Sequence, residues 1–435
     1  MSERVRPQPG RVPQRKRAPR FAGLFQTGGV DVAFTCLVMI LFAIGVTMMY
    51  SASYPYASAY SKNGPNVYFY NQLIFGLLGF VAMAIISKLD YRILNSFLTP
   101  LAFLATVFLL IFTYAWNVLK HNEIKRWLEI GGRQLQPSEL AKFVMVLTLS
   151  YVICILYRTL NGSSNRRIRP NIARLSGFEK SFFNYIDTKM KATVLLALIV
   201  ALFCGLVLIE SHLSCTILLF LIGVSMMWIS GVDKKWFVLL FIGLAAAVVL
   251  IVFVKPEIVK IISNYGYERI MVWKTKEDFG KTTRWQTEQG LYAIGAGGPF
   301  GVGFGNSKQK HLWLPEPQND FIFPIVVEEL GWVGGALIVL LFAALVIRGF
   351  MIATRTHDLF GALLVIGIMM QVGLQVILNI AVVTDVIPNT GIGLPFFSYG
   401  GTALFLMLCE MGVVLSVSRS CSARHETMKN EEREA

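Results

Sequence analysis

The fold is decided by the stretch LFGALLVIGIMMQVGLQVILNIAVV, residues 359–383. It contains no charged residue, and as an α-helix it is long enough to cross a bilayer core of roughly 30 Å. The chain is 55% hydrophobic and 15% charged, whereas soluble domains carry roughly 25% charged residues. The sequence therefore predicts an all-α polytopic membrane protein with ten transmembrane helices: Val32–Tyr50, Tyr70–Ser87, Leu94–Trp116, Ser138–Tyr157, Thr193–Ile209, Ser214–Ile229, Trp236–Val254, Phe321–Ile347, Leu359–Val383 and Gly400–Ser418.

The distribution of basic residues predicts the orientation. With ten spans, both termini lie on one side of the membrane. That side would carry 25 Lys and Arg residues and the opposite side 14. Because basic loops stay in the cytoplasm, we expect cytoplasmic termini and one long outer loop, Lys255–Asp320, between spans seven and eight.

This topology divides the chain into three parts. Residues 1–31 form a basic tail rich in Arg, Pro and Gln, which predicts disorder. Residues 32–418 form the membrane domain, and residues 419–435 form a second cytoplasmic tail. The net charge of +14 suits anionic lipid on the cytoplasmic face, so we expect no nucleic-acid partner.

Span nine carries a polar stripe at Gln371, Gln375 and Asn379, spaced four residues apart. Such a stripe either makes hydrogen bonds between helices or lines a hydrated cavity. The segment that follows is broken by Pro388 and Pro395. Irregular backbone at membrane depth must be buried in protein or line a cavity, which favours a cavity.

Span four begins with Pro137, and Glu139 and Lys142 follow on one helix face. The pair is either a structural ion pair at a helix start or part of a functional site. Because Lys142 falls just inside the membrane, where ionisable residues usually serve function, both interpretations stay open.

Three carboxylates mark the start of span eight. Asp320 lies at its mouth, where it could cap the helix through the Phe323 amide or act as a general base. Glu328 and Glu329 lie too deep for capping and need partners, for which Lys142 or Arg348 are candidates. The basic residues Lys308, Lys310 and His311 lie just upstream, a layout suited to a reaction on a lipid-borne anion.

Four motifs resemble those of the SEDS family (shape, elongation, division and sporulation), which includes FtsW, RodA and SpoVE. They are GGRQLQPSELAK, WQTEQGLYAIGAGGPFGVGFG, PEPQNDFIFPIVVEELGWVGG and VIPNTGIGLPFFSYGGTA, and they occur in family order. The segment LPEPQNDFIF, residues 314–323, resembles the FtsW and SpoVE branch more than RodA.

The resemblance implies a peptidoglycan glycosyltransferase that polymerises lipid II at the outer face of the bacterial cytoplasmic membrane, here in septal synthesis. It implies a class B penicillin-binding protein and other divisome or elongasome proteins as partners, and compatibility with Mg²⁺ or Mn²⁺. By this resemblance Asp320, Glu139 and Lys142 are the candidate catalytic residues. The residues expected to contact substrate are Arg133, Gln286, Gln289, Lys308, Lys310, Ser398 and Tyr399.

The corner between spans five and six departs from the family pattern. Many relatives carry P-D-x-G-T, whereas this chain reads ESHLSCT over residues 210–216. A role for the family's Asp cannot be transferred, and either the position is dispensable or Glu210 or His212 substitutes. The roles of Glu328, Glu329 and Glu410 are likewise not predicted.

Two other functions compete with polymerisation. A lipid II flippase would need polar groups through the whole membrane depth, which the stripe on span nine fits loosely. A scaffold without catalysis would tolerate replacement of Asp320.

Overall fold

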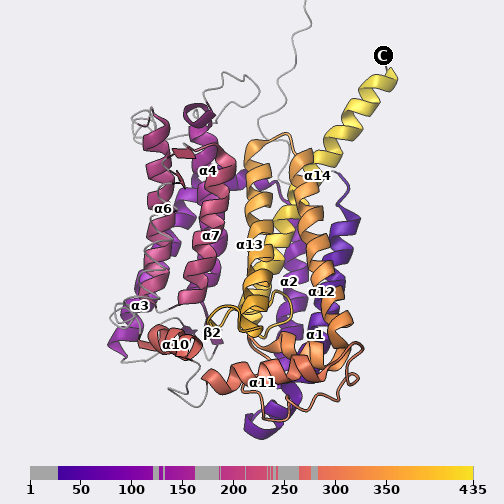
Figure 1. The fold of residues 1–435 in the computed structure, drawn as a ribbon. Helices are drawn as coiled ribbons and strands as arrows, with labels where there is room; N and C mark the ends of the chain where they lie inside the picture. Colours follow the sequence, from indigo (N-terminus) through magenta and orange to yellow (C-terminus); the bar gives the residue numbers. More distant parts are fainter. Residues whose placement is uncertain are drawn as a thin grey trace, which may run out of the picture.

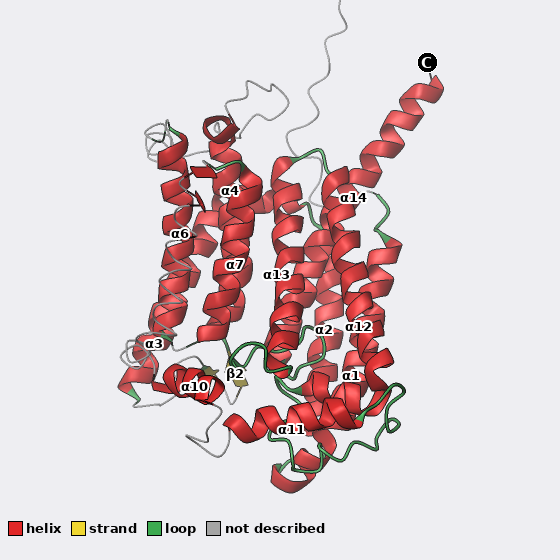
Figure 2. Ribbon diagram, viewed as in Figure 1, coloured by secondary structure: helices red, strands yellow, loops and turns green. Residues whose placement is uncertain are grey.

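The computed structural model describes residues 28–120, 127–130, 133–161, 186, 188–210, 212–232, 234–235, 237–238, 242, 264–275 and 283–434. Within these ranges the chain is a bundle of long, roughly parallel helices (Figures 1 and 2). Helix α11 lies across one end of the bundle in Figure 1, which we call the α11 end.

Nine of the described helices are long and apolar enough to cross a membrane, so the predicted polytopic helical fold is confirmed. The expected seventh span, Trp236–Val254, lies almost entirely outside the described ranges. The long helices are α1 (Val32–Tyr60), α2 (Val67–Lys88), α3 (Thr99–Leu119), α4 (Pro137–Asn161), α6 (Lys189–Ile209), α7 (Leu213–Ser230), α12 (Ile322–Arg355), α13 (Leu359–Val383) and α14 (Gly401–Glu434).

The shorter elements include a hairpin that the all-α prediction lacked. Strand β1 (Leu128–Ile130) pairs antiparallel with β2 (Arg133–Leu135), Leu128 opposite Leu135. Two helices, α10 (Asn264–Thr275) and α11 (Thr283–Ala296), lie in the predicted outer loop. A 3₁₀ turn and a π turn, η1 (Tyr91–Ile93) and η2 (Leu94–Leu98), precede α3.

The long helices form two groups. Helices α3, α4, α6 and α7 pack on one another, as do α1, α2, α12 and α14, and α13 contacts both groups. The two groups stand side by side in Figure 1, with α13 at their junction. Small residues bring α2 and α14 close together: a Cβ on Gly412 would lie 2.9 Å from the Met83 carbonyl oxygen.

Helix α12 is broken at Gly331, where φ is 76° and ψ is 173°. A Cβ at Gly331 would lie 2.3 Å from the Pro299 carbonyl oxygen, so glycine is required both by the left-handed backbone and by the neighbouring loop. The predicted span Phe321–Ile347 missed this break, because the apolar run continues through it.

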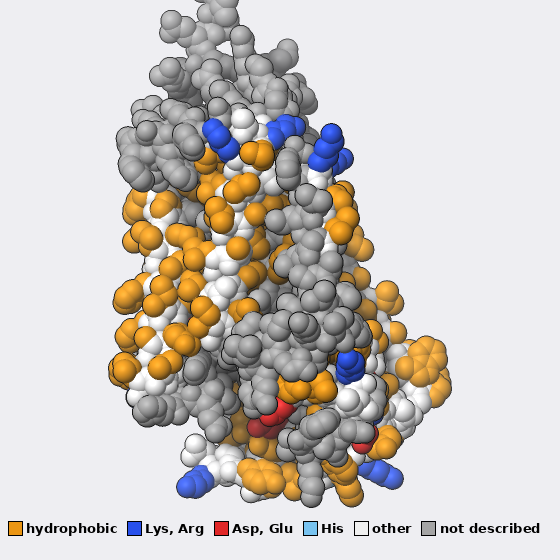
Figure 3. Space-filling view, turned by 60° about the vertical axis from the view of Figure 1, so that its left-hand side comes forward, with side chains coloured by type: hydrophobic (Ala, Val, Ile, Leu, Met, Phe, Trp, Pro, Cys, Tyr) orange, Lys and Arg blue, Asp and Glu red, His pale blue; other side chains and the backbone are white. Residues whose placement is uncertain are grey.

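The ends of the bundle are polar and its flanks apolar. In Figure 3, hydrophobic side chains cover the visible flank, and Lys and Arg side chains appear near both ends. At the end opposite α11, Arg348 of α12 pairs with Asp31, which caps α1; the shortest nitrogen–oxygen distance is 2.8 Å. This pair ties the two helices together at one level.

Candidate active site

A cavity of about 780 Å³ is lined by residues of both helix groups and reaches Gln286 of α11. It is lined by α2, α4, α7, α13 and α14, by Arg269 of α10 and by the irregular segment before α14. The prediction that this segment lines a cavity is confirmed. Six of the predicted site residues line it: Glu139, Lys142, Gln286, Asp320, Ser398 and Tyr399.

Asp320 lies at the rim of the cavity, just before α12. The N-cap position of that helix is Phe321, so Asp320 is not its N-cap residue. Its backbone carbonyl instead accepts a hydrogen bond from Asn379 Nδ2 at 2.8 Å. The backbone of Asp320 is therefore held by α13, while its carboxylate faces the cavity.

Arg269 approaches this carboxylate from α10 and was missed by the sequence prediction. A Cβ on Gly391 would lie 3.4 Å from Arg269 Nη1 and 3.6 Å from Asp320 Oδ2. Both charged groups therefore flank one backbone position whose φ of +78° also favours glycine. No motif marked Arg269, because it stands alone in a segment without a predicted partner.

Two contacts from α10 and α11 hold the loop that carries Gly391. Arg269 Nη1 donates to the Asn389 carbonyl oxygen at 2.9 Å, and Asn389 Nδ2 donates to Gln286 Oε1 at 3.0 Å. Gln286 also donates to the Pro315 carbonyl oxygen at 3.3 Å. Gln286 thus lines the cavity and also connects the loop before Asp320 with the loop that carries Asn389.

Glu139 and Lys142 form the second charged group of the cavity. Their carboxylate and ammonium are 2.7 Å apart, and Lys142 is 2% exposed. Lys142 Nζ also donates to Gln375 Oε1 at 3.2 Å. Deeper in the bundle, Glu410 accepts a hydrogen bond from Gln371 at 2.9 Å. The ion pair is structural and also faces the cavity, so the two interpretations are compatible.

The polar stripe of α13 makes hydrogen bonds to neighbouring segments at all three positions. Gln371 bonds to Glu410, Gln375 donates to the Gly393 carbonyl, and Asn379 donates to the carbonyls of Asp320 and Ile392. Gln375 also lines the cavity. The stripe therefore connects α13 to α14, to the segment before α14 and to the backbone of Asp320.

Ser398 and Tyr399 shape the rim near α2. Ser398 Oγ accepts from the Leu394 amide at 2.7 Å, which closes a turn in the segment before α14. The Tyr399 amide donates to the Gln318 carbonyl at 2.8 Å, and its ring packs edge-on against Tyr68. These residues hold the loop that ends at Asp320 beside the cavity.

Four predicted substrate contacts are not among the cavity-lining residues. Gln289 is buried in α11, and Lys308 is exposed on the loop. Lys310 is 4% exposed, and its ammonium lies 2.7 Å from Glu329 Oε1. The sequence did not predict this ion pair, because Lys310 and Glu329 are brought together only where the chain turns back between them. Arg133 lies in β2, and its side chain falls outside the described part of the structure.

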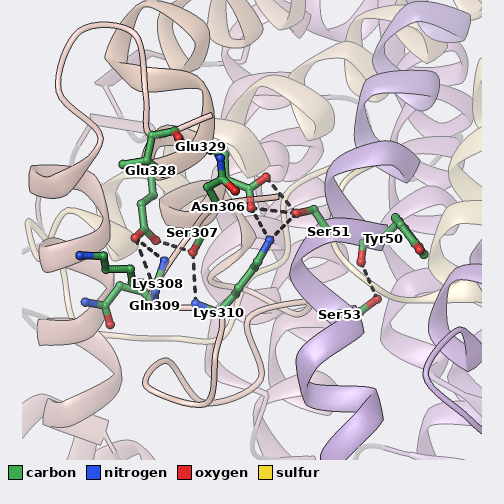
Figure 4. Close-up of polar contacts among 11 residues, drawn as sticks. Tyr50, Ser51, Ser53, Asn306, Ser307, Lys308, Gln309, Lys310, Glu328 and Glu329 are labelled. Atoms are coloured by element: carbon green, nitrogen blue, oxygen red, sulfur yellow. Dashed lines mark hydrogen bonds and ion pairs between the residues drawn. The ribbon is translucent and has the colours of Figure 1, made fainter. Parts of the chain in front are cut away.

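Glu328 and Glu329 have partners other than those predicted (Figure 4). Ser307 Oγ donates to Glu328 Oε2 at 2.5 Å, and the Lys308 amide donates to Oε1 at 2.8 Å. Glu329 accepts from Lys310 and from Ser51 of α1. The expectation of Lys142 or Arg348 as partners is wrong, because Lys142 pairs with Glu139 and Arg348 with Asp31.

At the corner between α6 and α7, His212 lines the cavity, whereas Glu210 is not among its lining residues. His212 Nδ1 lies 3.0 Å from Ser138 Oγ and 3.2 Å from Gln136 Nε2. Glu210 is fully buried, and neither carboxyl oxygen has a hydrogen-bond partner among the described residues. Of the two substitutes considered for the family's Asp, His212 therefore reaches the cavity.

Burial raises the pKa of Glu210 to about 8, and this predicts a pH-dependent stability. In the folded protein, Glu210 stays protonated up to about pH 8. In the unfolded chain, its carboxyl group ionises near its usual pKa of about 4.3. The free energy of unfolding should therefore fall as pH rises through this window, by on the order of a few kcal/mol at most. Glu210→Gln should lessen that fall.

Thermal unfolding in detergent at about pH 5, 7 and 9 measures this difference. Relative to the wild type, the variant should gain stability as pH rises. Parallel curves for the two proteins would contradict a protonated Glu210.

Comparison with known proteins identifies the family. The profile of the FtsW/RodA/SpoVE family, described as cell cycle proteins, matches residues 31–423. The chain is 34% identical over 391 residues to the stage V sporulation protein E of Bacillus subtilis, covering 89% of this chain and 97% of that protein. It is 31% identical over 395 residues to the probable peptidoglycan glycosyltransferase FtsW of Geobacter sp. strain M18, covering 90% and 97%.

Two solved structures share the fold. One, described as a peptidoglycan synthase complex that coordinates polymerization and crosslinking, superposes with a TM-score of 0.65 at 25% identity, covering 90% of this chain and 98% of the matched chain. The rod shape determining protein RodA of Thermus thermophilus superposes with a TM-score of 0.59 at 22% identity, covering 90% and 97%. With a family match that covers nearly the whole chain, this multi-pass membrane protein belongs to the FtsW/RodA/SpoVE family of cell cycle proteins.

Proposed function

We propose that this protein is a peptidoglycan glycosyltransferase that polymerises lipid II, in septal wall synthesis during cell division. One observation carries the proposal: a single cavity joins a charged rim, with Asp320 and Arg269, to an apolar interior that includes Leu218, Leu404 and Met407. Such a cavity suits a substrate with a polar head and a lipid tail. The names of the FtsW relatives support the same activity.

In this mechanism Asp320 is the general base. The acceptor's sugar hydroxyl gives its proton to Asp320 as its oxygen bonds to the anomeric carbon of the donor. The bond from that carbon to the polyprenyl pyrophosphate breaks, and the pyrophosphate leaves with the electron pair. A positioned base contributes roughly 10²- to 10⁴-fold to the rate.

The cationic residues stabilise the leaving group. Arg269 and Lys142 both line the cavity, and Lys142 is paired with Glu139. Negative charge that develops on the pyrophosphate is stabilised by such preorganised cations. Lys310, one of the predicted substrate contacts, is instead held in an ion pair with Glu329, so we assign the cation beside Asp320 to Arg269.

A divalent cation, Mg²⁺ or Mn²⁺, stays a proposal. The described residues contain no group of three or more His, Cys, Asp or Glu side chains that could hold a metal ion. The described side chains therefore do not form a protein-only binding site for the cation. The steps above use no metal.

We propose a class B penicillin-binding protein as partner, within a larger set of divisome or elongasome membrane proteins. The similarity to a chain from a peptidoglycan synthase complex supports this partner. Crosslinking by the partner would use the strands that this chain polymerises.

We also propose ten spans with cytoplasmic termini, the seventh being Trp236–Val254. A cysteine at Asn306, which is exposed at the α11 end, should react with an impermeant maleimide in spheroplasts. A cysteine at His357, exposed at the opposite end, should react only after permeabilisation. The reverse pattern would invert the topology and remove Asp320 from the outer face.

The activity is tested with purified lipid II and the purified protein together with its penicillin-binding partner. Glycan polymer on a gel is the expected product. A flippase would instead move labelled lipid II across liposomes without forming polymer, and a scaffold would do neither.

A further inference from the structure

The loop between α11 and α12 exposes large apolar side chains. We call residues Gly297–Gly305 the glycine loop. Phe300 is 82% exposed and Phe304 51%, and Val302 between them is also exposed. Apolar side chains clustered on one loop indicate a surface that something apolar covers. The glycine loop is part of the predicted outer loop, Lys255–Asp320.

Backbone hydrogen bonds fix the glycine loop against α12. The amides of Val302 and Gly303 donate to the carbonyls of Glu328 and Glu329, at 2.9 and 3.1 Å. The amides of Trp332 and Val333 donate in turn to the carbonyls of Gly298 and Pro299, at 2.9 and 3.2 Å. The depth of the loop along the bundle is therefore the depth of α12 at residues 328–333.

Helix α12 gives one measure of that depth. Arg348 and its partner Asp31 form a charged pair where α1 begins, which marks one edge of the apolar layer. Gly331 precedes Arg348 by 17 residues, or about 25 Å of helix. Because the hydrocarbon core is about 30 Å thick, Gly331 and the adjoining Phe300 lie just inside its other edge.

Helix α1 gives an independent measure. Ser51 follows Asp31 by 20 residues, or about 30 Å of helix. Its hydroxyl bonds to Glu329, at 2.8 Å from Oε1. Helices α1 and α12 thus place the Ser51–Glu329 contact about one hydrocarbon thickness from the Asp31–Arg348 pair. Pro299–Gly301, beside Gly331, lie slightly closer to the middle of the bilayer.

The glycine loop also continues a lipid-facing surface. Exposed apolar side chains run along α12 at Trp332, Val333, Leu337 and Leu340, and Trp332 bonds through its amide to Gly298 of the loop. Lys308, exposed a few residues farther along, suits the phosphate groups at the membrane surface.

We propose that the glycine loop re-enters the bilayer, with Phe300, Val302 and Phe304 inserted among the acyl chains at the headgroup boundary. The occupant of this surface is lipid of the leaflet at the α11 end, which is the outer leaflet in the topology above. The chain runs outward from Phe300 to Asn306, since Gly303 already bonds to Glu329. The turn at Pro299 and Phe300 is therefore the deepest part of the loop.

Nitroxide labels at Phe300→Cys and Asn306→Cys test this insertion. The full-length protein, with its six native cysteines replaced, is placed in nanodiscs of phosphatidylethanolamine and phosphatidylglycerol. The ratio of oxygen to nickel-chelate collision should be several-fold higher at position 300 than at 306. Equal, water-like accessibility at both positions would overturn the proposal.

Low accessibility of position 300 to both reagents would also overturn it, because the loop would then be covered by protein. A second measurement leaves the native cysteines in place. Phe300→Trp should add fluorescence that brominated lipid quenches, relative to the wild type, whereas Asn306→Trp should add fluorescence that it barely quenches. Equal quenching of the two added signals would argue against insertion.

Discussion

Asp320→Asn should lower lipid II polymerisation by at least about 10²-fold, the contribution expected of a general base, while leaving the fold intact. Asn keeps the size of the side chain and removes its basicity. The contact that holds this residue uses its backbone carbonyl, which accepts from Asn379 and is unchanged in the variant. Since Asp320 is not the N-cap residue of α12, thermal stability should change little.

Glu316→Gln is the matched control for this experiment. Glu316 lines the same cavity four residues upstream, and the substitution removes the same charge. We expect it to keep most of the polymerising activity. Near-normal polymer from Asp320→Asn, with loss in Glu139→Gln, would transfer the role of base to Glu139.

Lys142→Met should abolish polymer and also destabilise the protein. Lys142 is buried against Glu139, with Glu410 nearby, so its removal leaves carboxylates without a compensating charge. Breaking one partner of a buried ion pair typically costs about 3–5 kcal/mol. The single variant alone therefore does not separate a structural from a catalytic role.

The double variant Lys142→Met with Glu139→Gln separates them. It removes both charges of the pair, so thermal stability should recover toward the wild-type value. If Lys142 acts on the pyrophosphate, polymerisation stays lost in the double variant at matched stability but persists in Glu139→Gln alone. Recovery of polymer would show that Lys142 serves only to balance Glu139.

The spans were predictable where the apolar runs have clear ends. Leu359–Val383 was predicted with its observed bounds, because Asp358 caps the helix through the Gly361 amide and polar residues follow Val383. The break of helix α12 at Gly331 was not predicted. It depends on the glycine loop, which packs against Gly331 from another part of the chain. Hydropathy carries no information on such a contact.

The site was predictable where local motifs mark it. Glu139 and Lys142 share a helix face, and Asp320 stands at a helix start, so each could be identified from its neighbours in sequence. Arg269 and Lys310 could not be assigned. The former meets Asp320 across a glycine of another segment, and the latter pairs with a carboxylate after a chain reversal.

The two hydrogen bonds of Asn379 have a mechanical consequence. Its amide donates to the Asp320 carbonyl at 2.8 Å and to the Ile392 carbonyl at 2.7 Å. The segments that carry the base and the opposite rim are thus clamped to one side chain of α13 and cannot separate from each other without breaking it. Because both segments share this one donor group, any widening of the cavity between Asp320 and Ile392 requires at least one of the two hydrogen bonds to break.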